Sequence, residues 1–285
     1  MRGLKIKKEK PIVIASWGDT HPNSTVGLIP PRGIALDDGG WYRPSDVQLE
    51  IWNVYLEYWD AVKERKREVG AEQVWGVFGG EGVDDNKYSK YQLATVNESV
   101  MLDIGVSAMR PAMDVVDRQF CLRSTEAHSG GSSWMEERLA KELGAEQDPD
   151  TGNSSWWFLP MEKYGVRSLF AHHPYSTARR PWTIGGGANR TAEMIEADYN
   201  KTQDPLPHFA VFHHAHAYET SSDNHEVDVT ICYPFCVTGA LGHRIGYSGR
   251  SSEIGGLVYT LFPDGTWDKK RFRRTPRRKE PWTDQ

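Results

Sequence analysis

The sequence predicts an α/β domain, and three observations lead to this prediction. Short apolar segments bounded by turn-forming residues recur up to residue 212, and segments with helical spacing of apolar residues separate several of them. Beyond residue 227 the pattern becomes that of β-structure. The 285 residues, 38% of them hydrophobic and 11 of them Trp, are sufficient to fill one large core or two small ones.

Five apolar segments have the length and composition of buried strands. They cover residues 11–16, 74–78, 120–123, 166–171 and 208–212. Further strands are expected at 227–234, where apolar and polar residues alternate, and in a hairpin formed by 257–262 and 266–272. Strands and helices therefore alternate in the first part of the chain, whereas strands follow one another in the last part.

Three segments, 45–70, 133–144 and 189–200, have the apolar spacing of amphipathic helices. The first two begin with a capping box, in which a Ser is followed three residues later by Gln or Glu. These pairs are Ser45 with Gln48 and Ser133 with Glu136. A glycine at the end of each of these two segments supplies a suitable stop.

The composition indicates a cytoplasmic protein without disulfides. Cys121, Cys232 and Cys236 are an odd number of cysteines without CxxC spacing, so reduced thiols are expected. No apolar run approaches the roughly 18 residues that a membrane helix needs. The first ten residues also lack the apolar core of a signal peptide, so neither a membrane span nor secretion is expected.

The net charge of −5 conceals a strongly basic segment near the C-terminus. From Lys269 to Lys279, eight of eleven residues are Lys or Arg. We therefore expect a domain from 1 to 268 and a basic tail from 269 to 285. Such a tail can attract a polyanion through counterion release, and the alternative is a solvated extension without a partner.

Each of the five strands expected before residue 213 is followed by a cluster of His, Asp or Glu. Seven of the ten histidines lie in these clusters. A lone histidine is more simply a hydrogen-bonded residue, but the carboxyl ends of strands in an open α/β sheet face one crevice. Imidazole and carboxylate without thiolate are ligands for Zn, Mn or Fe in hydrolytic sites. The sequence therefore predicts a metal site that can hold two ions.

In their order these clusters resemble the motifs of the calcineurin-like metallophosphoesterase family, most closely its phage and bacterial branch. Residues 18–21, Gly-Asp-Thr-His, are similar to the family's Asp-x-His motif, and 80–84, Gly-Glu-Gly-Val-Asp, to its Gly-Asp-x-x-Asp motif. Residues 124–128, Ser-Thr-Glu-Ala-His, correspond loosely to Gly-Asn-His-Glu/Asp. His172 matches a single strand-end histidine, and 213–216, His-His-Ala-His, match Gly-His-x-His.

The resemblance implies a ligand set for two divalent metal ions, which would be Mn, Fe or Zn. The first ion would be bound by Asp19, His21 and His216, and the second by His172 and His214, with Thr125 or Glu126 near the position of the family's asparagine ligand. Glu81 would stand at the bridging position between the two ions. His128 would contact the phosphoryl group or the leaving oxygen, as a general acid or as a stabiliser of the transition state.

The resemblance also implies a fold and a reaction. The fold is a single domain in which two packed mixed sheets are flanked by helices, an α/β/β/α sandwich. The reaction is hydrolysis of a phosphodiester by a metal-bridging hydroxide, and the basic ends make DNA a possible substrate and a nuclease a possible activity. Because Glu81 replaces an aspartate and the Gly-Asn-His motif is missing, the alternative is a nucleic-acid-binding or interaction protein that keeps the fold without catalysis.

Other polar residues near the clusters have two interpretations each. Arg179 and Arg180 can hold a phosphate through bidentate hydrogen bonds or belong to a surface loop. His173 and His213 are expected to support the neighbouring ligands or to lie in the core, since adjacent strand residues face opposite sides. Asp84 can orient a ligand, but a solvated turn is the preferred interpretation.

Overall fold

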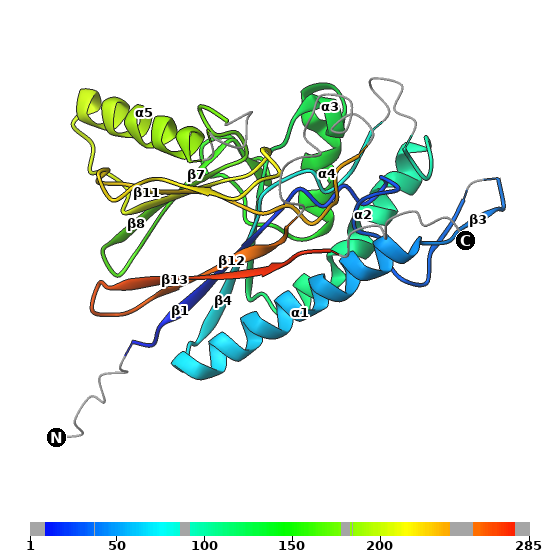
Figure 1. Cartoon of the computed structure of the whole chain (residues 1–285), viewed down its shortest axis with the longest axis horizontal. Helices are drawn as coiled ribbons and strands as arrows, with labels where there is room; N and C mark the ends of the chain where they lie inside the picture. The colour runs from blue at the N-terminus through cyan, green and yellow to red at the C-terminus, as the bar shows by residue number, and fades with distance from the viewer. Residues whose placement is uncertain are drawn as a thin grey trace, which may run out of the picture.

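The strands form two mixed sheets and one short two-stranded pair in the computed structural model, which describes residues 9–36, 38–85, 92–177, 183, 185–239 and 253–276 (Figure 1). The six-stranded sheet has the order β13-β12-β1-β4-β5-β6. Its strands are β1 (Ile12–Trp17), β4 (Gln73–Phe78), β5 (Arg118–Leu122), β6 (Ser155–Trp156), β12 (Ile254–Leu261) and β13 (Trp267–Arg274). The first four are mutually parallel, and β12 runs antiparallel to both β1 and β13.

The five-stranded sheet has the order β10-β11-β9-β8-β7. Its strands are β7 (Phe158–Lys163), β8 (Val166–Ala171), β9 (Phe209–Phe212), β10 (Glu219–Thr220) and β11 (Asp228–Ile231). Here β8, β9 and β11 are parallel, and the two edge strands are antiparallel to their neighbours. The separate pair joins β2 (Ile34–Ala35) to β3 (Trp41–Tyr42).

Helices cover the outer face of each sheet, which gives four layers. The five-stranded sheet packs against α5 (Gly186–Thr202), which lies above it in Figure 1. On the other side, α1 (Asp46–Val69), α2 (Glu98–Met113) and α4 (Trp134–Glu142) pack against the six-stranded sheet. Between the sheets lies a separate apolar cluster in which the ring of Phe209 stacks on that of Tyr259 at 4.2 Å. The predicted α/β/β/α sandwich is therefore confirmed.

Most of the expected elements are present with small shifts of their ends. The five strands predicted before residue 213 correspond to β1, β4, β5, β8 and β9, and the predicted hairpin is formed by β12 and β13. The helix α2 and the edge strand β7 were not predicted. No helix within the described ranges is long and apolar enough to span a membrane. All three cysteines are buried and free, as expected.

One of the two predicted capping boxes is confirmed and the other is wrong. At α1 the Ser45 hydroxyl accepts from the Gln48 backbone N–H, and the Gln48 side chain accepts from the Ser45 N–H at 3.1 Å. At α4, Ser133 has a φ of 54° and its hydroxyl donates to the Ser124 carbonyl at 2.6 Å instead. Glu136 is thereby free to reach another part of the fold.

Strand β13 contains the first six residues of the segment expected as a basic tail. All eight residues of β13 pair with β12, so the chain continues as part of the sheet beyond residue 268. The basic side chains of β13 also meet partners within the protein. The pairs are Lys269 with Asp228, Lys270 with Glu68, Arg271 with the ring of Tyr218, Arg273 with Glu253 and Arg274 with Glu57. Residues 277–285 lie outside the described residues.

Candidate metal centre

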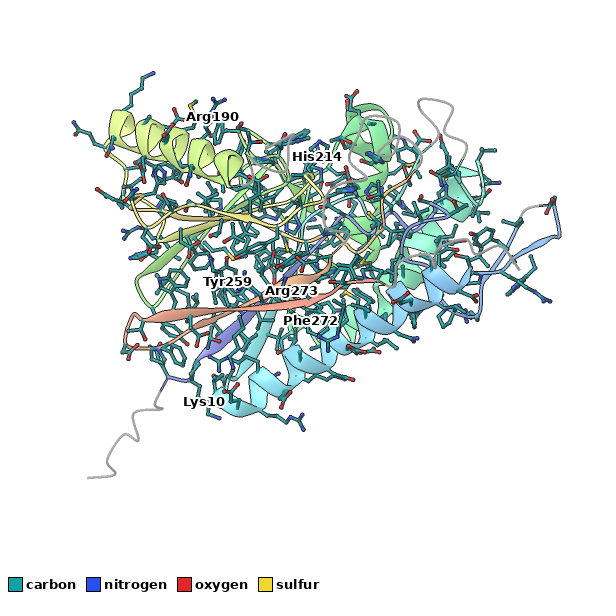
Figure 2. The ribbon with its side chains drawn as sticks, viewed as in Figure 1. Lys10, Arg190, His214, Tyr259, Phe272 and Arg273 are labelled. Atoms are coloured by element: carbon teal, nitrogen blue, oxygen red, sulfur yellow. The ribbon has the colours of Figure 1, made fainter. Side chains whose placement is uncertain are left out.

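The loops that follow β1, β4, β5, β8 and β9 meet at the carboxyl ends of these strands. Backbone hydrogen bonds join them: Asp19 N–H donates to the Gly80 carbonyl at 3.0 Å, and His21 N–H to the Glu81 carbonyl at 2.9 Å. His213 N–H donates to the His172 carbonyl at 3.1 Å and so links the loops after β8 and β9. Figure 2 shows His214 on the side of the molecule that carries α3 (Glu126–Ser129) and α5, away from Lys10.

Glu81 lies at the centre of this meeting point, and its side chain is fully buried. Its two carboxylate oxygens face different histidines. Oε2 is 2.6 Å from His21 Nε2 and 3.5 Å from His216 Nε2. Oε1 is 3.3 Å from His172 Nε2, 3.4 Å from His214 Nδ1 and 3.7 Å from His128 Nε2. One buried carboxylate therefore contacts five imidazoles that come from four loops.

Asp19 adds a second buried carboxylate to the same cluster. One oxygen of Asp19, one of Glu81 and one ring nitrogen of His216 lie within 4.8 Å of one another, a spacing that suits a shared metal ion. The Asp19 carboxylate also accepts from the backbone N–H of His214, at 3.0 and 3.2 Å. This contact ties the loop after β1 to the loop after β9. The structure thus brings together Asp19, His21, Glu81, His172, His214 and His216, as the sequence predicted.

Three atoms of the cluster have the property expected of metal ligands. Glu81 Oε1, His172 Nε2 and His214 Nδ1 are buried, and none of them makes a hydrogen bond within the described part of the chain. Buried polar atoms in native proteins are nearly always satisfied, and leaving one unsatisfied costs about 1–3 kcal/mol. A cation bound among these atoms would satisfy all three, so the residues present fit a metal ion.

Many of the candidate ligands have a strained, left-handed backbone conformation. Nine non-glycine residues among those described have positive φ, and five of them are candidate ligands. They are Asp19 at 49°, His21 at 42°, Glu81 at 60°, His214 at 66° and His216 at 50°. This conformation costs roughly 1–2 kcal/mol for a residue with a side chain. Such outliers gather at functional sites, where the surrounding structure holds them in place.

Charge within the cluster overrides the effect of burial on ionisation. Burial alone would raise the pKa of Glu81, but the positive charges of His128 and His21 and the hydrogen bond from His21 lower it well below its ordinary value. In the same way burial opposes protonation of His21 and His216, yet the acidic groups beside them, Glu81 among them, raise both pKa values well above the ordinary value. Glu81 therefore remains an anion and attracts cations to the centre of the cluster.

Asp84 belongs to the site, so the preferred interpretation of a solvated turn is wrong. It is 5% exposed, and its Oδ1 lies 2.8 Å from His128 Nδ1, while its Oδ2 lies 3.5 Å from His21 Nδ1. Burial would raise the pKa of Asp84, but these two histidines lower it strongly. The ionised carboxylate accepts the Nδ1–H of His128 and leaves Nε2 of that ring facing Glu81.

Glu136 supports the loop that carries Glu81. Its carboxylate accepts from the backbone N–H groups of Glu81 and Gly82 at 3.2 and 3.3 Å, and from the Ser124 hydroxyl at 2.6 Å. Burial raises the pKa of Glu136 to about 7. This side chain, which the sequence suggested as a helix cap, therefore connects α4 to the strained backbone at the centre of the site.

Cys236 contacts a ligand on the side away from Glu81. Its Sγ lies 3.6 Å from Nδ1 of His216, and both residues form a group with His21 whose ligand atoms lie within 4.8 Å of one another. A hydrogen bond at one ring nitrogen fixes the tautomer and the orientation of a metal-binding histidine. Cys236 therefore directs Nε2 of His216 toward Glu81. It follows β11 as the other site residues follow their strands, which is the sequence signal that could have identified it.

The remaining expected residues are Glu126, His173, Arg179 and Arg180. The carboxylate of Glu126 accepts from Ser132 N–H at 2.9 Å, is exposed, and joins none of the metal-ligand groups found among the described residues, so the structure does not bring it into the cluster. Its backbone begins α3, which turns the side chain outward. Arg179 and Arg180 lie outside the described residues. His173 is exposed and lies beside the candidate ligands His172 and His214, which is the first of its two expected positions.

His213 lies in the core, as expected. It is fully buried and packs between the backbones of Gly18 and Gly79, with Nε2 3.2 Å from the Ser16 hydroxyl. A Cβ atom added to Gly79 would lie 2.3 Å from the ring, and one added to Gly18 would lie 2.7 Å from it. The two glycines directly precede the loops that carry Asp19 and Glu81. The ring of His213 therefore sets the distance between these loops.

No protein-family model matches the sequence, and no curated protein matches it. Similar folds occur among solved structures. A 5'-nucleotidase from Candida albicans matches with 8% identity and a TM-score of 0.43, over 93% of this chain and 51% of its own. An NAD nucleotidase from Haemophilus influenzae matches with 10% identity and a TM-score of 0.42, over 93% and 50%. Vps29 from Chaetomium thermophilum matches with 11% identity and a TM-score of 0.35, over 93% and 96%. These TM-scores do not assign a family.

Replacement of Gly79 by alanine tests the packing under the site. We expect Gly79→Ala to lower the free energy of unfolding by about 1–3 kcal/mol, because the added methyl overlaps the His213 ring in a packed core. The displaced loop should also bind divalent cations more weakly. Urea unfolding and calorimetric titration measure the two effects. Gly186→Ala is the matched control, since its Cβ would meet no atom within 4 Å. Equal stability of both variants would contradict the expectation.

Replacement of Cys236 tests its contact with His216. Cys236→Ala should weaken divalent-cation binding roughly 10-fold or more, because the freed His216 ring can turn away from Glu81. Cys236→Ser retains a polar atom in the same place and should bind more tightly than the alanine variant. Calorimetric titration of the metal-free proteins with Zn²⁺ measures both. Wild-type affinity in Cys236→Ala would show that the sulfur does not orient the ring.

Proposed function

We propose that this protein is a metal-dependent phosphoesterase of the calcineurin-like type, whose two divalent cations are held on either side of Glu81. The proposal rests on one observation: the two oxygens of this buried carboxylate face different histidines. Oε2 faces His21 and His216, whereas Oε1 faces His172 and His214. A carboxylate that presents each oxygen to a separate pair of imidazoles is suited to bridge two cations.

The residues divide into two ligand sets on this basis. Asp19, His21, His216 and Glu81 would hold one cation, and His172, His214 and Glu81 would hold the other. Imidazole and carboxylate ligands suit Zn, Mn or Fe. Two such cations supply Lewis acidity toward a phosphoryl oxygen and lower the pKa of a bound water molecule. The glutamate side chain is longer than that of aspartate, and the backbone at Glu81, with φ of 60° and the support of Glu136, provides a position for it.

His128 and Asp84 supply the proton chemistry. Asp84 holds Nδ1 of His128 at 2.8 Å, so Nε2 is the nitrogen that faces the cluster. With 23% of its side chain exposed, His128 can reach a substrate that enters from solvent. From this position the imidazolium can donate a proton to the leaving oxygen of a phosphoester, which is general-acid catalysis.

DNA is the phosphodiester substrate that the basic C-terminal segment suggests. The described part of this segment contributes little to DNA binding, because the basic side chains of β13 already meet acidic or aromatic partners. Any DNA contact from this end of the chain therefore depends on residues 277–279. Parallel assays with a p-nitrophenyl monoester, a bis(p-nitrophenyl) diester, and single- and double-stranded DNA distinguish the substrate classes.

Neutralisation of Glu81 tests the proposal. Glu81→Gln keeps the shape of the side chain but removes the charge that faces five histidines. After loading with metal, elemental analysis should find two equivalents of metal per wild-type chain and less than one per Glu81→Gln chain. Diester hydrolysis by Glu81→Gln should fall to background. Glu162→Gln, at an exposed position on β7, is the control and should behave as wild type. A wild-type protein that binds no cation after loading would instead favour a binding protein without catalysis.

Replacement of His128 separates acid catalysis from metal binding. His128→Gln should keep both cations and lower kcat by roughly 10²–10⁴-fold for a diester with an alkyl leaving group. The loss should be much smaller with p-nitrophenolate, which leaves without a proton. Steady-state kinetics on the two substrates make the comparison. Equal losses on both substrates would exclude His128 as the general acid.

A further inference from the structure

We propose that His173 is a ligand of the second cation, which would then be bound by three imidazoles and one carboxylate oxygen. This inference rests on the proposed function and goes beyond the ligand set assigned above. The expectation that His173 supports a neighbour or lies in the core came from the alternation of side chains along a strand. Strand β8 ends at Ala171, and the chain bends at the two residues that follow, so alternation does not apply to them.

The second cation position already has three converging donors. His172 Nδ1 is 2.6 Å from the Gly79 carbonyl, which requires this nitrogen to carry the proton and leaves Nε2 as the free donor atom. That Nε2 lies 3.3 Å from Glu81 Oε1, and His214 Nδ1 lies 3.4 Å from the same oxygen. All three atoms are buried without a hydrogen bond in the described residues.

His173 supplies a fourth donor at the open side of this position. Its ring centroid is 4.4 Å from that of His214 and 4.8 Å from that of His172. One ring nitrogen from each of these three residues lies within 4.8 Å of the other two. His173 is exposed while His172 is buried, so of these two rings it is His173 that faces solvent. Four donors of this kind match the tetrahedral nitrogen and oxygen sets that Zn²⁺ prefers.

The neighbouring loop offers weaker candidates for the same place. Glu126 is exposed and bonded to Ser132, so its carboxylate is directed elsewhere. Thr125 Oγ1 is buried and makes no hydrogen bond within the described residues, which makes it the competitor to His173. A neutral hydroxyl is a poorer donor to Zn²⁺ or Fe²⁺ than an imidazole. The set with His173 therefore predicts a preference at this position for Zn²⁺ over Mg²⁺ or Ca²⁺, which favour oxygen ligands.

The experiment measures cation binding by three variants of the full chain. Metal-free wild type, His173→Ala, Thr125→Val and His225→Ala are titrated with Zn²⁺ by calorimetry and then analysed for bound zinc. His225 is the matched control, because it contacts Glu196 on α5 and lies outside the cluster. We expect wild type, Thr125→Val and His225→Ala each to bind two equivalents of Zn²⁺ per chain. In His173→Ala one equivalent should remain tight, and the other should weaken by at least the roughly 10–100-fold that loss of a supporting partner costs.

Two results would overturn the inference. Wild-type affinity for both equivalents in His173→Ala would show that His173 is no ligand, and a raised KM in that variant would then place it on the substrate instead. Loss of one equivalent in Thr125→Val alone would assign the position to the hydroxyl. Either result leaves the proposed function intact, because wild type would still bind two cations and hydrolyse the diester. Failure of wild type itself to bind cations would remove the proposed function together with the inference.

Discussion

A buried carboxylate that must remain charged is the constraint around which this structure is organised. Transfer of an ionised group from water into a protein interior is costly unless partners compensate it, and Glu81 has no exposed surface at all. The compensation comes from imidazoles on four loops, and it requires the carboxyl ends of both sheets to meet at one point. The four-layer arrangement satisfies this requirement, because it packs the two sheets face to face with these ends together.

The same requirement explains features that otherwise look unfavourable. Left-handed backbone at five candidate ligand residues costs free energy, and so does a further buried acid, Glu136, next to Glu81. Both costs are offset locally. Glu136 accepts the N–H groups of the loop that it stabilises, and the loops after β1 and β4 extend the hydrogen bonding of their strands across Asp19 and His21. Packing of His213 against two glycines leaves these loops little room to move.

The sequence located the residues of the cluster better than the residues that support them. Apolar runs identify the strands, and parallel strands align their carboxyl ends at one edge of a sheet. A polar cluster that directly follows such a run, as at Asp19 and His214, can therefore be recognised from the local pattern as part of a shared site. Glu136 acts through contacts that depend on how α4 docks, which no local spacing reveals. Cys236 could have been identified from its place after β11, but its contact with His216 depends on how that segment docks. The place of Glu126 was likewise not predictable from local spacing, because this residue begins the short helix α3, where its carboxylate is exposed.

The position of β1 has a consequence for the order in which the protein assembles. This strand lies in the middle of its sheet, with β4 on one edge and β12 on the other, and the β12 partner of Ile12 is Leu261. Lys269 on β13 then joins the sheets by its ion pair with Asp228 on β11. The β12 side of β1 therefore stays unpaired until residues 254–261 have been synthesised. Pairs between residues so far apart in the chain form slowly, because closing the long loop between them costs entropy, so the sheet that carries Asp19 and Glu81 is completed late in folding.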